Sequence, residues 1–397
     1  MESLGLGGRN DAAEGWILRQ RRLGGRSRIS AAATLRTPRE FRPQPLVPLR
    51  RHLTIPRLPS GQVGSPKSFN DAHAGLIVSR LAQGASLRIT GKSVKKKILG
   101  YSSLVLITGF LFWYFFIALK PVEIPQKEIV NSYRYPPIQT ESVELKELHP
   151  NSFEITFRSF DGSIVNGQIT YPENDEAKHP VVVGISAMGR NYHRWWVESF
   201  KGRPTVTNVN KVGEAALESG YAVVAIDARY HGSRKDPDRT LRSIMNDLHF
   251  FGDKSVYEEM IVNTVKDYRV LLDWLESQDG IDSRNIVMAG YSMGGQVALL
   301  TASVDDRVNG VVSIVPPYLD DKVALVAPKN VVSLLDSAQV LLITSDDDEN
   351  ASEEENLSLF NEIATTRKEH QIFEGSHILP ARYVESVREW LVDASRD

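Results

Sequence analysis

The chain contains no cysteine among its 397 residues. This absence excludes disulfide bonds, thiol nucleophiles, iron–sulfur clusters and cysteine-based zinc sites. It also removes the usual indicator of a redox compartment, so export is permitted without being indicated. With 42% hydrophobic and 24% charged residues, the composition is that of a globular protein with one large domain plus appendages.

Acidic residues are scarce at the start of the chain. Residues 1–97 hold 19 Lys and Arg against 5 Asp and Glu, whereas the remaining 300 residues hold 28 against 44. Residues 1–91 are rich in Arg, Pro, Gly and Ser without an apolar period, which predicts disorder. Two hypotheses stay open: an organellar transit peptide, or a segment that is not translated because a non-ATG start lies near Val94. The lack of methionine between Met1 and Met188 favours the second.

Charge is absent altogether from residues 98–119, a run of 22 residues. A helix of this length spans about 30 Å of hydrocarbon, which predicts a single transmembrane helix. Four lysines precede the run within residues 92–97 and favour a cytoplasmic N-terminal side. The expected organisation is therefore a basic flank and anchor at 92–119, a linker at 120–150 and a main domain at 151–397 on the non-cytoplasmic side, the periplasm if the protein is bacterial.

Apolar runs typical of strands alternate with helical periods from residue 151 onward. Eight such runs are expected at 153–157, 164–171, 181–185, 221–226, 286–289, 311–315, 340–343 and 370–373. Two alternating runs followed by strand–helix repeats predict an α/β fold, a mostly parallel eight-stranded sheet with an antiparallel edge and helices on both faces. Ligands of such sheets bind at the carboxyl ends of the strands.

One strand end carries the pattern Gly-x-Ser-x-Gly, at Gly290, Ser292 and Gly294. An apolar strand precedes it and a helix-forming run follows, so Ser292 is expected on a sharp strand-to-helix turn with its hydroxyl exposed. The helix N-terminus also directs backbone N–H groups at this position, where they favour a developing oxyanion. Ser292 is the candidate nucleophile.

The segment GYSMGG, together with the order of strands around it, resembles the α/β-hydrolase superfamily over about residues 150–397. The preceding DWLESQDGIDSRNIVMA is similar to the branch that includes dienelactone hydrolases, acetyl xylan esterases and prolyl-oligopeptidase-like enzymes. The resemblance implies a Ser-His-Asp triad in the chain order serine, acid, histidine, with no metal or organic cofactor.

The triad partners are sought after Ser292. His370 falls within the last expected strand, whereas His377 follows that strand in a loop and matches the family position of the base. The family pattern selects Asp348 as the acid after the strand VLLIT, with Asp347 and Asp346 as alternatives. Some relatives carry the acid after the preceding strand, where Asp320 and Asp321 stand, so the choice of acid stays open.

The oxyanion hole is expected from two backbone amides. One is Met293, directly after the nucleophile. The other comes from the loop after the third strand, where the family commonly has His-Gly-x-Gly and this chain has Ser-Ala-Met-Gly at 186–189, which selects Met188.

The resemblance thus implies a serine hydrolase, a carboxylesterase acting through an acyl-enzyme. The alternatives are a prolyl-oligopeptidase-type peptidase and an inert membrane-tethered binding protein of the same fold. The expected partners are a small-molecule ester and a membrane through residues 98–119, with no nucleic acid. The acyl and alcohol groups of the substrate and the oligomeric state stay open.

Overall fold

The computed structural model describes residues 91–137, 143–174 and 176–394, with side chains from residue 101 onward. Residues 1–90, for which disorder is predicted together with Gly91, lie outside the described residues. The first described element is the helix α1, Gly91–Phe116.

The described residues form one main sheet of nine strands in the order β1-β2-β3-β7-β4-β8-β9-β10-β11. From β7 to β11 all neighbours are parallel, whereas β1, β2, β3 and β7 pair antiparallel. The strands are β1 Glu144–His149, β2 Ser152–Arg158, β3 Ile164–Thr170, β4 His179–Ile185, β7 Ala222–Ile226, β8 Ile281–Tyr291, β9 Gly310–Ile314, β10 Gln339–Ser345 and β11 Lys368–Phe373. This is the predicted α/β-hydrolase sheet with an antiparallel edge.

The predicted count of eight strands was one short. The additional strand is β1, which pairs with β2 at the edge of the sheet and is exposed along its whole length. Its sequence ELKELH lacks an alternation of apolar and polar residues that one buried face would impose, so periodicity did not indicate a strand. A separate two-stranded ribbon joins β5, Ser199–Phe200, to β6, Arg203–Pro204.

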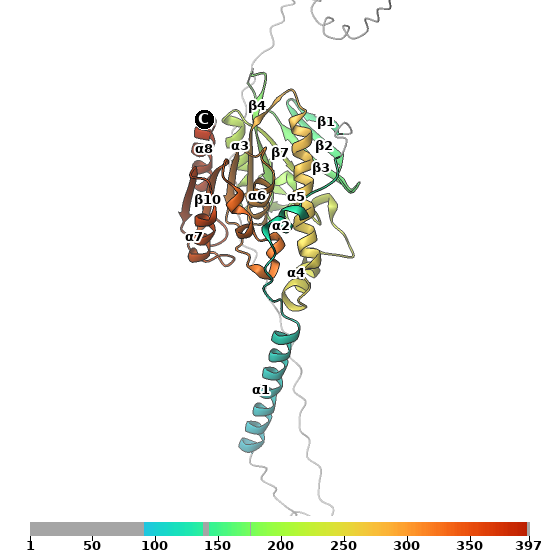
Figure 1. The fold of residues 1–397 in the computed structure, drawn as a ribbon, viewed down its shortest axis with the longest axis vertical. Coiled ribbons are helices and arrows are strands. Elements are labelled where there is room, and N and C mark those ends of the chain that lie inside the picture. Colours follow the sequence, from blue (N-terminus) through green and yellow to red (C-terminus); the bar gives the residue numbers. More distant parts are fainter. Residues whose placement is uncertain (1–90, 138–142, 175, 395–397) are drawn as a thin grey trace, which may run out of the picture. The chain divides into compact units, whose positions relative to one another are not determined.

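Helices cover both faces of the sheet (Figure 1). Alternate residues of one strand enter different cores: Val181 and Val183 pack into one buried cluster and Val182 into the other. The first cluster includes side chains of α2 Gln126–Ser132, α4 Leu241–Phe250, α5 Ser255–Glu276, α6 Met293–Val304 and α7 Glu353–Glu362. The second includes side chains of α3 Val209–Glu218 and α8 Tyr383–Ala394. A central sheet held between two apolar layers leaves its strand ends free to carry functional groups.

Part of the segment that was expected to be a linker packs into the domain. Ile129 and Tyr133, in and directly after α2, are fully buried. The Tyr133 hydroxyl donates to the carbonyl of Leu325 at 2.9 Å, and its own carbonyl accepts from the guanidinium of Arg269 at 2.9 Å. The domain core therefore begins near residue 126.

The segment predicted to span a membrane is helical through Phe116, within α1. Among the described residues, however, no helix is both long and apolar enough to cross a membrane.

Candidate active site

Ser292 lies at the junction between β8 and α6. Its backbone has φ 57° and ψ −121°, a region that residues with a side chain rarely adopt. Its amide donates to the carbonyl of Ile314 at 2.8 Å and joins the turn to β9. The serine is therefore held on a strained turn at the carboxyl end of a central strand.

The two glycines of the motif are required by close backbone contacts. A Cβ atom on Gly290 would lie 2.1 Å from the carbonyl oxygen of Gly294, and one on Gly294 would lie 2.2 Å from that of Ile185. Both distances are far below van der Waals contact, and the obstructing atoms are backbone. The turn forms only because both positions lack side chains.

His377 stands between Ser292 and Asp348. Its Nε2 is 2.8 Å from the Ser292 hydroxyl oxygen, and its Nδ1 is 3.0 and 2.9 Å from the two carboxylate oxygens of Asp348. With the proton on Nδ1, the imidazole donates to Asp348 and accepts from the serine hydroxyl. The carboxylate is 1% exposed and the imidazole 16%, so water hardly competes for these hydrogen bonds.

The loop that carries His377 is fixed by groups that the sequence did not single out. The Tyr291 hydroxyl donates to the carbonyl of His377 at 2.7 Å and accepts from the amide of Leu379 at 3.0 Å. Burial raises the pKa of Tyr291 to about 12, so it stays a hydrogen-bond donor at neutral pH. Its position directly before the nucleophile was the only signal in the sequence.

The alternative acids have other partners. Asp346 accepts from the amide of Gly375 at 2.9 Å, and Asp347 is exposed. Asp320 pairs with Lys322 at 2.8 Å, and Asp321 with Lys329 at 2.9 Å. His370 is also elsewhere: on β11, its Nε2 lies 2.8 Å from the Thr344 hydroxyl. Of the acids considered, Asp348 is the one that contacts His377.

The amides expected to form the oxyanion hole belong to neighbouring segments. A Cβ atom on Gly294 would meet the carbonyls of both Ile185 and Ser186, so the loop after β4 abuts the start of α6. Within the described part of the chain, neither the Met188 nor the Met293 amide donates a hydrogen bond to another residue. The two donors are thus available to an oxygen of a bound substrate.

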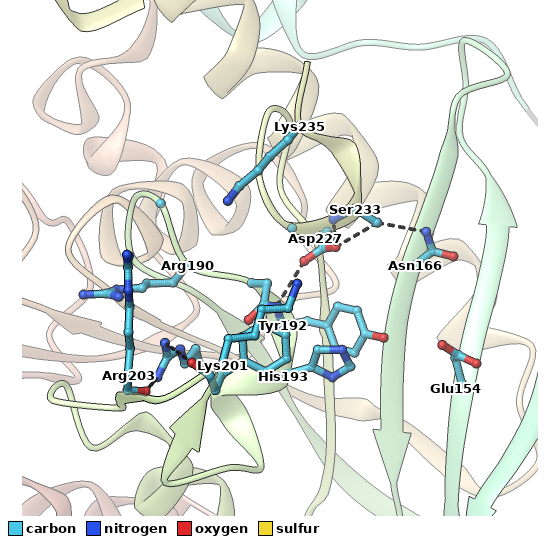
Figure 2. A pocket seen from close by; sticks show the side chains of 15 residues that line it. Glu154, Asn166, Arg190, Tyr192, His193, Lys201, Arg203, Asp227, Ser233 and Lys235 are labelled. Carbon is cyan, nitrogen blue, oxygen red and sulfur yellow. Dashed lines mark hydrogen bonds between the residues drawn. The ribbon is translucent and has the colours of Figure 1, made fainter. Parts of the chain in front are cut away.

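A cleft of about 660 Å³ is lined in part by the loop after β4, from Gly189 onward, and its lining does not include Ser292. Asp227, which follows β7, lines it and organises its wall (Figure 2). One carboxylate oxygen accepts from the amide of Tyr192 at 3.1 Å; the other accepts from the amide and hydroxyl of Ser233 at 2.7 and 2.9 Å. A Cβ atom on Gly232 would lie 2.0 Å from this carboxylate, so the turn needs glycine there.

Residues 126–330 match the family described as acetyl xylan esterase (AXE1), which is slightly more than half of the chain. The chain belongs to the acetyl xylan esterase family. The predicted membership in the α/β-hydrolase superfamily is thereby confirmed. The match contains Ser292 and both expected oxyanion donors, and it ends before Asp348 and His377.

Two curated proteins are similar to this acetyl xylan esterase family member over shorter stretches. YtaP of Bacillus subtilis (strain 168), whose name describes a hydrolase, is 26% identical over 173 residues, 43% of this chain and 55% of YtaP. The quorum-quenching protein AidA of Acinetobacter baumannii (strain MDR-ZJ06) is 29% identical over 103 residues, 26% of this chain and 28% of AidA. The match thus spans little more than half of one relative and less of the other.

Among solved structures, acetyl xylan esterase 1 from Thermoanaerobacterium sp. JW/SL YS485 superimposes with a TM-score of 0.56 and 16% identity. The superposition covers 70% of this chain and 96% of that enzyme. At this identity the likeness establishes the fold, and the chemistry has to be argued from the site itself.

Proposed function

We propose that this member of the acetyl xylan esterase family is a serine hydrolase of carboxylesterase type. The observation that carries the proposal is the 2.8 Å separation of the Ser292 hydroxyl oxygen and His377 Nε2, with Asp348 on the opposite side of the imidazole. Nucleophile, base and orienting acid are the three groups that acyl transfer by a serine requires.

In the proposed first step, Ser292 Oγ attacks the ester carbonyl carbon while His377 Nε2 takes the hydroxyl proton. Asp348 holds the imidazole in the required tautomer and stabilises the imidazolium. The oxygen of the tetrahedral intermediate carries the negative charge and accepts from the amides of Met188 and Met293; one such donor contributes about 2.7 to 4 kcal/mol in other serine hydrolases.

The intermediate then collapses. The bond between the carbonyl carbon and the alcohol oxygen breaks, and His377 gives its proton to the departing alcohol. Water next attacks the acyl-enzyme, with its proton passing to Nε2, and release of the carboxylic acid returns that proton to Ser292. The chain's own residues supply each of these proton transfers.

The substrate class follows from the family. Its name points to acetyl esters, so a small acyl group is proposed for this chain. A prolyl-oligopeptidase-type peptidase uses the same triad but needs residues that hold peptide ends, and the described domain has no propeller before its catalytic sheet. Esters of small acids are therefore the first substrates to test.

The test is labelling of the full chain with a fluorophosphonate probe, followed by mass spectrometry of the adduct. Wild type is compared with Ser292→Ala and His377→Ala, and Ser358→Ala on α7 serves as the control serine. We expect an adduct on Ser292 that is lost in both site variants and kept in the control. Absence of an adduct on the folded wild type would favour the inert binding protein, and hydrolysis of amides but not of acetyl esters would favour the peptidase.

Membrane attachment through residues 98–119 is a separate part of the proposal, with the N-terminal side cytoplasmic. Its support is the uncharged run of 22 residues and the exposure of eleven large apolar side chains between Tyr101 and Phe116. Exposed apolar area of this size is costly in water. Carbonate extraction of expressing cells tests attachment, and protease treatment of sealed vesicles tests orientation. Recovery of the chain in the carbonate supernatant contradicts the anchor, and digestion of the domain from the cytoplasmic side contradicts the orientation.

A further inference from the structure

The cleft beside the candidate active site is lined by an excess of positive charge. Five cationic side chains line the cleft, compared with two carboxylates. The cations come from three segments: the loop after β4, the β5–β6 ribbon and the turn after β7; they are Arg190, Arg194, Lys201, Arg203 and Lys235.

Neither carboxylate forms a salt bridge with these cations. Asp227 is 2% exposed and accepts hydrogen bonds from Tyr192 and Ser233. Glu154 pairs with Lys146, at 3.4 Å. In the part of the chain that the structure describes, no salt bridge joins any of the five cations to a carboxylate.

Arg194 shows the cost of this arrangement most clearly, because it is 5% exposed. Its guanidinium donates to the carbonyl of Arg203 at 2.7 Å and to the hydroxyl of Thr205 at 3.0 Å, both neutral acceptors. Burial, followed by the charges of Arg190 and Arg203, lowers its pKa. A buried cation surrounded by like charges is unfavourable unless an anion joins it.

Other well-buried arginines of the domain have such a partner. Arg229 and Arg234 both contact Asp267, at 2.7 and 2.6 Å, and Arg307 contacts Asp305 at 2.7 Å. The fold therefore neutralises these three well-buried arginines with carboxylates, whereas among the described residues the cations of this cleft have none.

The cleft lies close to the proposed chemistry. Arg190 follows the expected oxyanion donor Met188 by two residues, a span of less than about 8 Å along the chain. Asp227 follows β7, Met188 follows β4 and Ser292 follows β8, and these three strands are neighbours in the parallel part of the sheet. Because β4 lies between β7 and β8, the ends of these two strands are about 10 Å apart, a distance that one small molecule can span. The cleft's volume also falls in the usual range for small-molecule sites.

We propose that this cleft is an anion subsite that receives an acidic group, a carboxylate, sulfate or phosphate, carried by the ester substrate. The inference rests on the proposed esterase function and narrows it to anionic esters. Lys201 and Lys235 enter the cleft from different sides, as Figure 2 shows, and together with Arg190 they present donors that match the oxygens of such a group.

The test uses a matched pair of esters, 4-nitrophenyl butyrate and the 4-nitrophenyl monoester of succinic acid, which differ by a terminal methyl or carboxylate. The full-length wild type is compared with Lys201→Gln and Lys235→Gln, both exposed positions at which folding should persist. We expect the ratio of kcat/KM for the anionic ester to that for the neutral ester to fall about tenfold in each variant, because a charge-assisted hydrogen bond is lost. The control Lys211→Gln removes an exposed lysine on α3, outside the cleft, and should leave the ratio unchanged.

Inorganic phosphate separates this inference from the proposed function. On Ser292→Ala, which cannot form an acyl-enzyme, phosphate should raise the unfolding temperature more than chloride does at equal ionic strength. This difference should shrink in Ser292→Ala with Lys235→Gln. If the esters are not hydrolysed while phosphate still stabilises through Lys235, the proposed function fails and the anion site stands.

If the neutral ester is hydrolysed and the ratio does not change in the cleft variants, the subsite is overturned while the esterase stands. Phosphate inhibition decides where the anion comes from. Competition with the anionic ester alone supports a substrate group in the cleft, whereas equal inhibition of both esters means that a free anion acts there and overturns the substrate assignment.

Discussion

Asp348 differs from its two acidic neighbours in burial and in its contact with His377. Its side chain is 1% exposed, whereas Asp346 and Asp347 are exposed. Asp348→Asn keeps the shape but favours the wrong imidazole tautomer, so kcat on 4-nitrophenyl acetate is expected to fall by about 10⁴-fold. Asp347→Asn is the matched control and should stay within a few-fold of wild type. Similar losses in both variants would contradict the assignment of Asp348.

His231 provides a pH-dependent element of stability at the residue scale. It is fully buried, and its Nδ1–H donates to the carbonyl of Arg229 at 2.6 Å; within the described residues its Nε2 has no hydrogen-bond partner. Burial lowers its pKa below the ordinary 6.5, with Asp227 opposing and Lys235 and Arg234 adding to the shift. The folded state therefore disfavours the charged form.

The sign of the effect follows from linkage. Above about pH 6.5 His231 is neutral in both states, whereas below it the unfolded chain binds a proton that the folded chain does not. The free energy of unfolding is thus expected to fall as the pH drops below about 6.5. Urea unfolding between pH 7.5 and 5 should show a shallower decline for His231→Asn, which keeps a side-chain donor without a titrating group. Identical slopes would contradict this role.

The turn between β8 and α6 is the element on which the site depends. Because Gly294 abuts the backbone of Ile185, Gly294→Ala must separate α6 from β4 and displace the two expected oxyanion donors. We expect kcat to fall by about 10²-fold or more, together with a lower unfolding temperature. Gly109→Ala in α1, where a Cβ atom would meet no atom of the described residues within 4 Å, is the control and should change neither quantity appreciably. Wild-type activity in Gly294→Ala would show that the contact is dispensable.

At the scale of the whole molecule, α2 decides where the folded domain begins. Ile129 and Tyr133 are fully buried, and each such side chain stabilises the fold by about 1.5 to 3 kcal/mol. A chain starting at residue 120 is expected to unfold at the temperature of the full domain, whereas one starting at residue 143 should be much less stable or insoluble. Circular dichroism melts of the two chains check this. Equal unfolding temperatures of the two chains would show that residues 120–142 are only a linker.

Much of the molecule was predictable because its information is local. Eight strands, the strand-to-helix turn at Ser292 and the branch that includes acetyl xylan esterases were predicted from short apolar runs, one motif and the segment before it, and the fold and family confirm them. Strand β1 was not predicted because an exposed edge strand imposes no alternation of apolar and polar residues. The helix α2 was not predicted because its one buried residue, Ile129, with Tyr133 directly after the helix, is too little to set an apolar period.

What the sequence determined by itself was the type of each group and its order along the chain: the candidate nucleophile Ser292, then an acidic loop, then His377. Only the tertiary structure decided which acid faces the histidine. The pairing of β10 with β11 fixes where the loops after these two strands meet, and it places Asp346 against Gly375 and Asp348 against His377. The cationic cleft likewise exists only in the tertiary structure. Its charges come from segments spread over residues 190–235, and they converge because β4 and β7 end side by side.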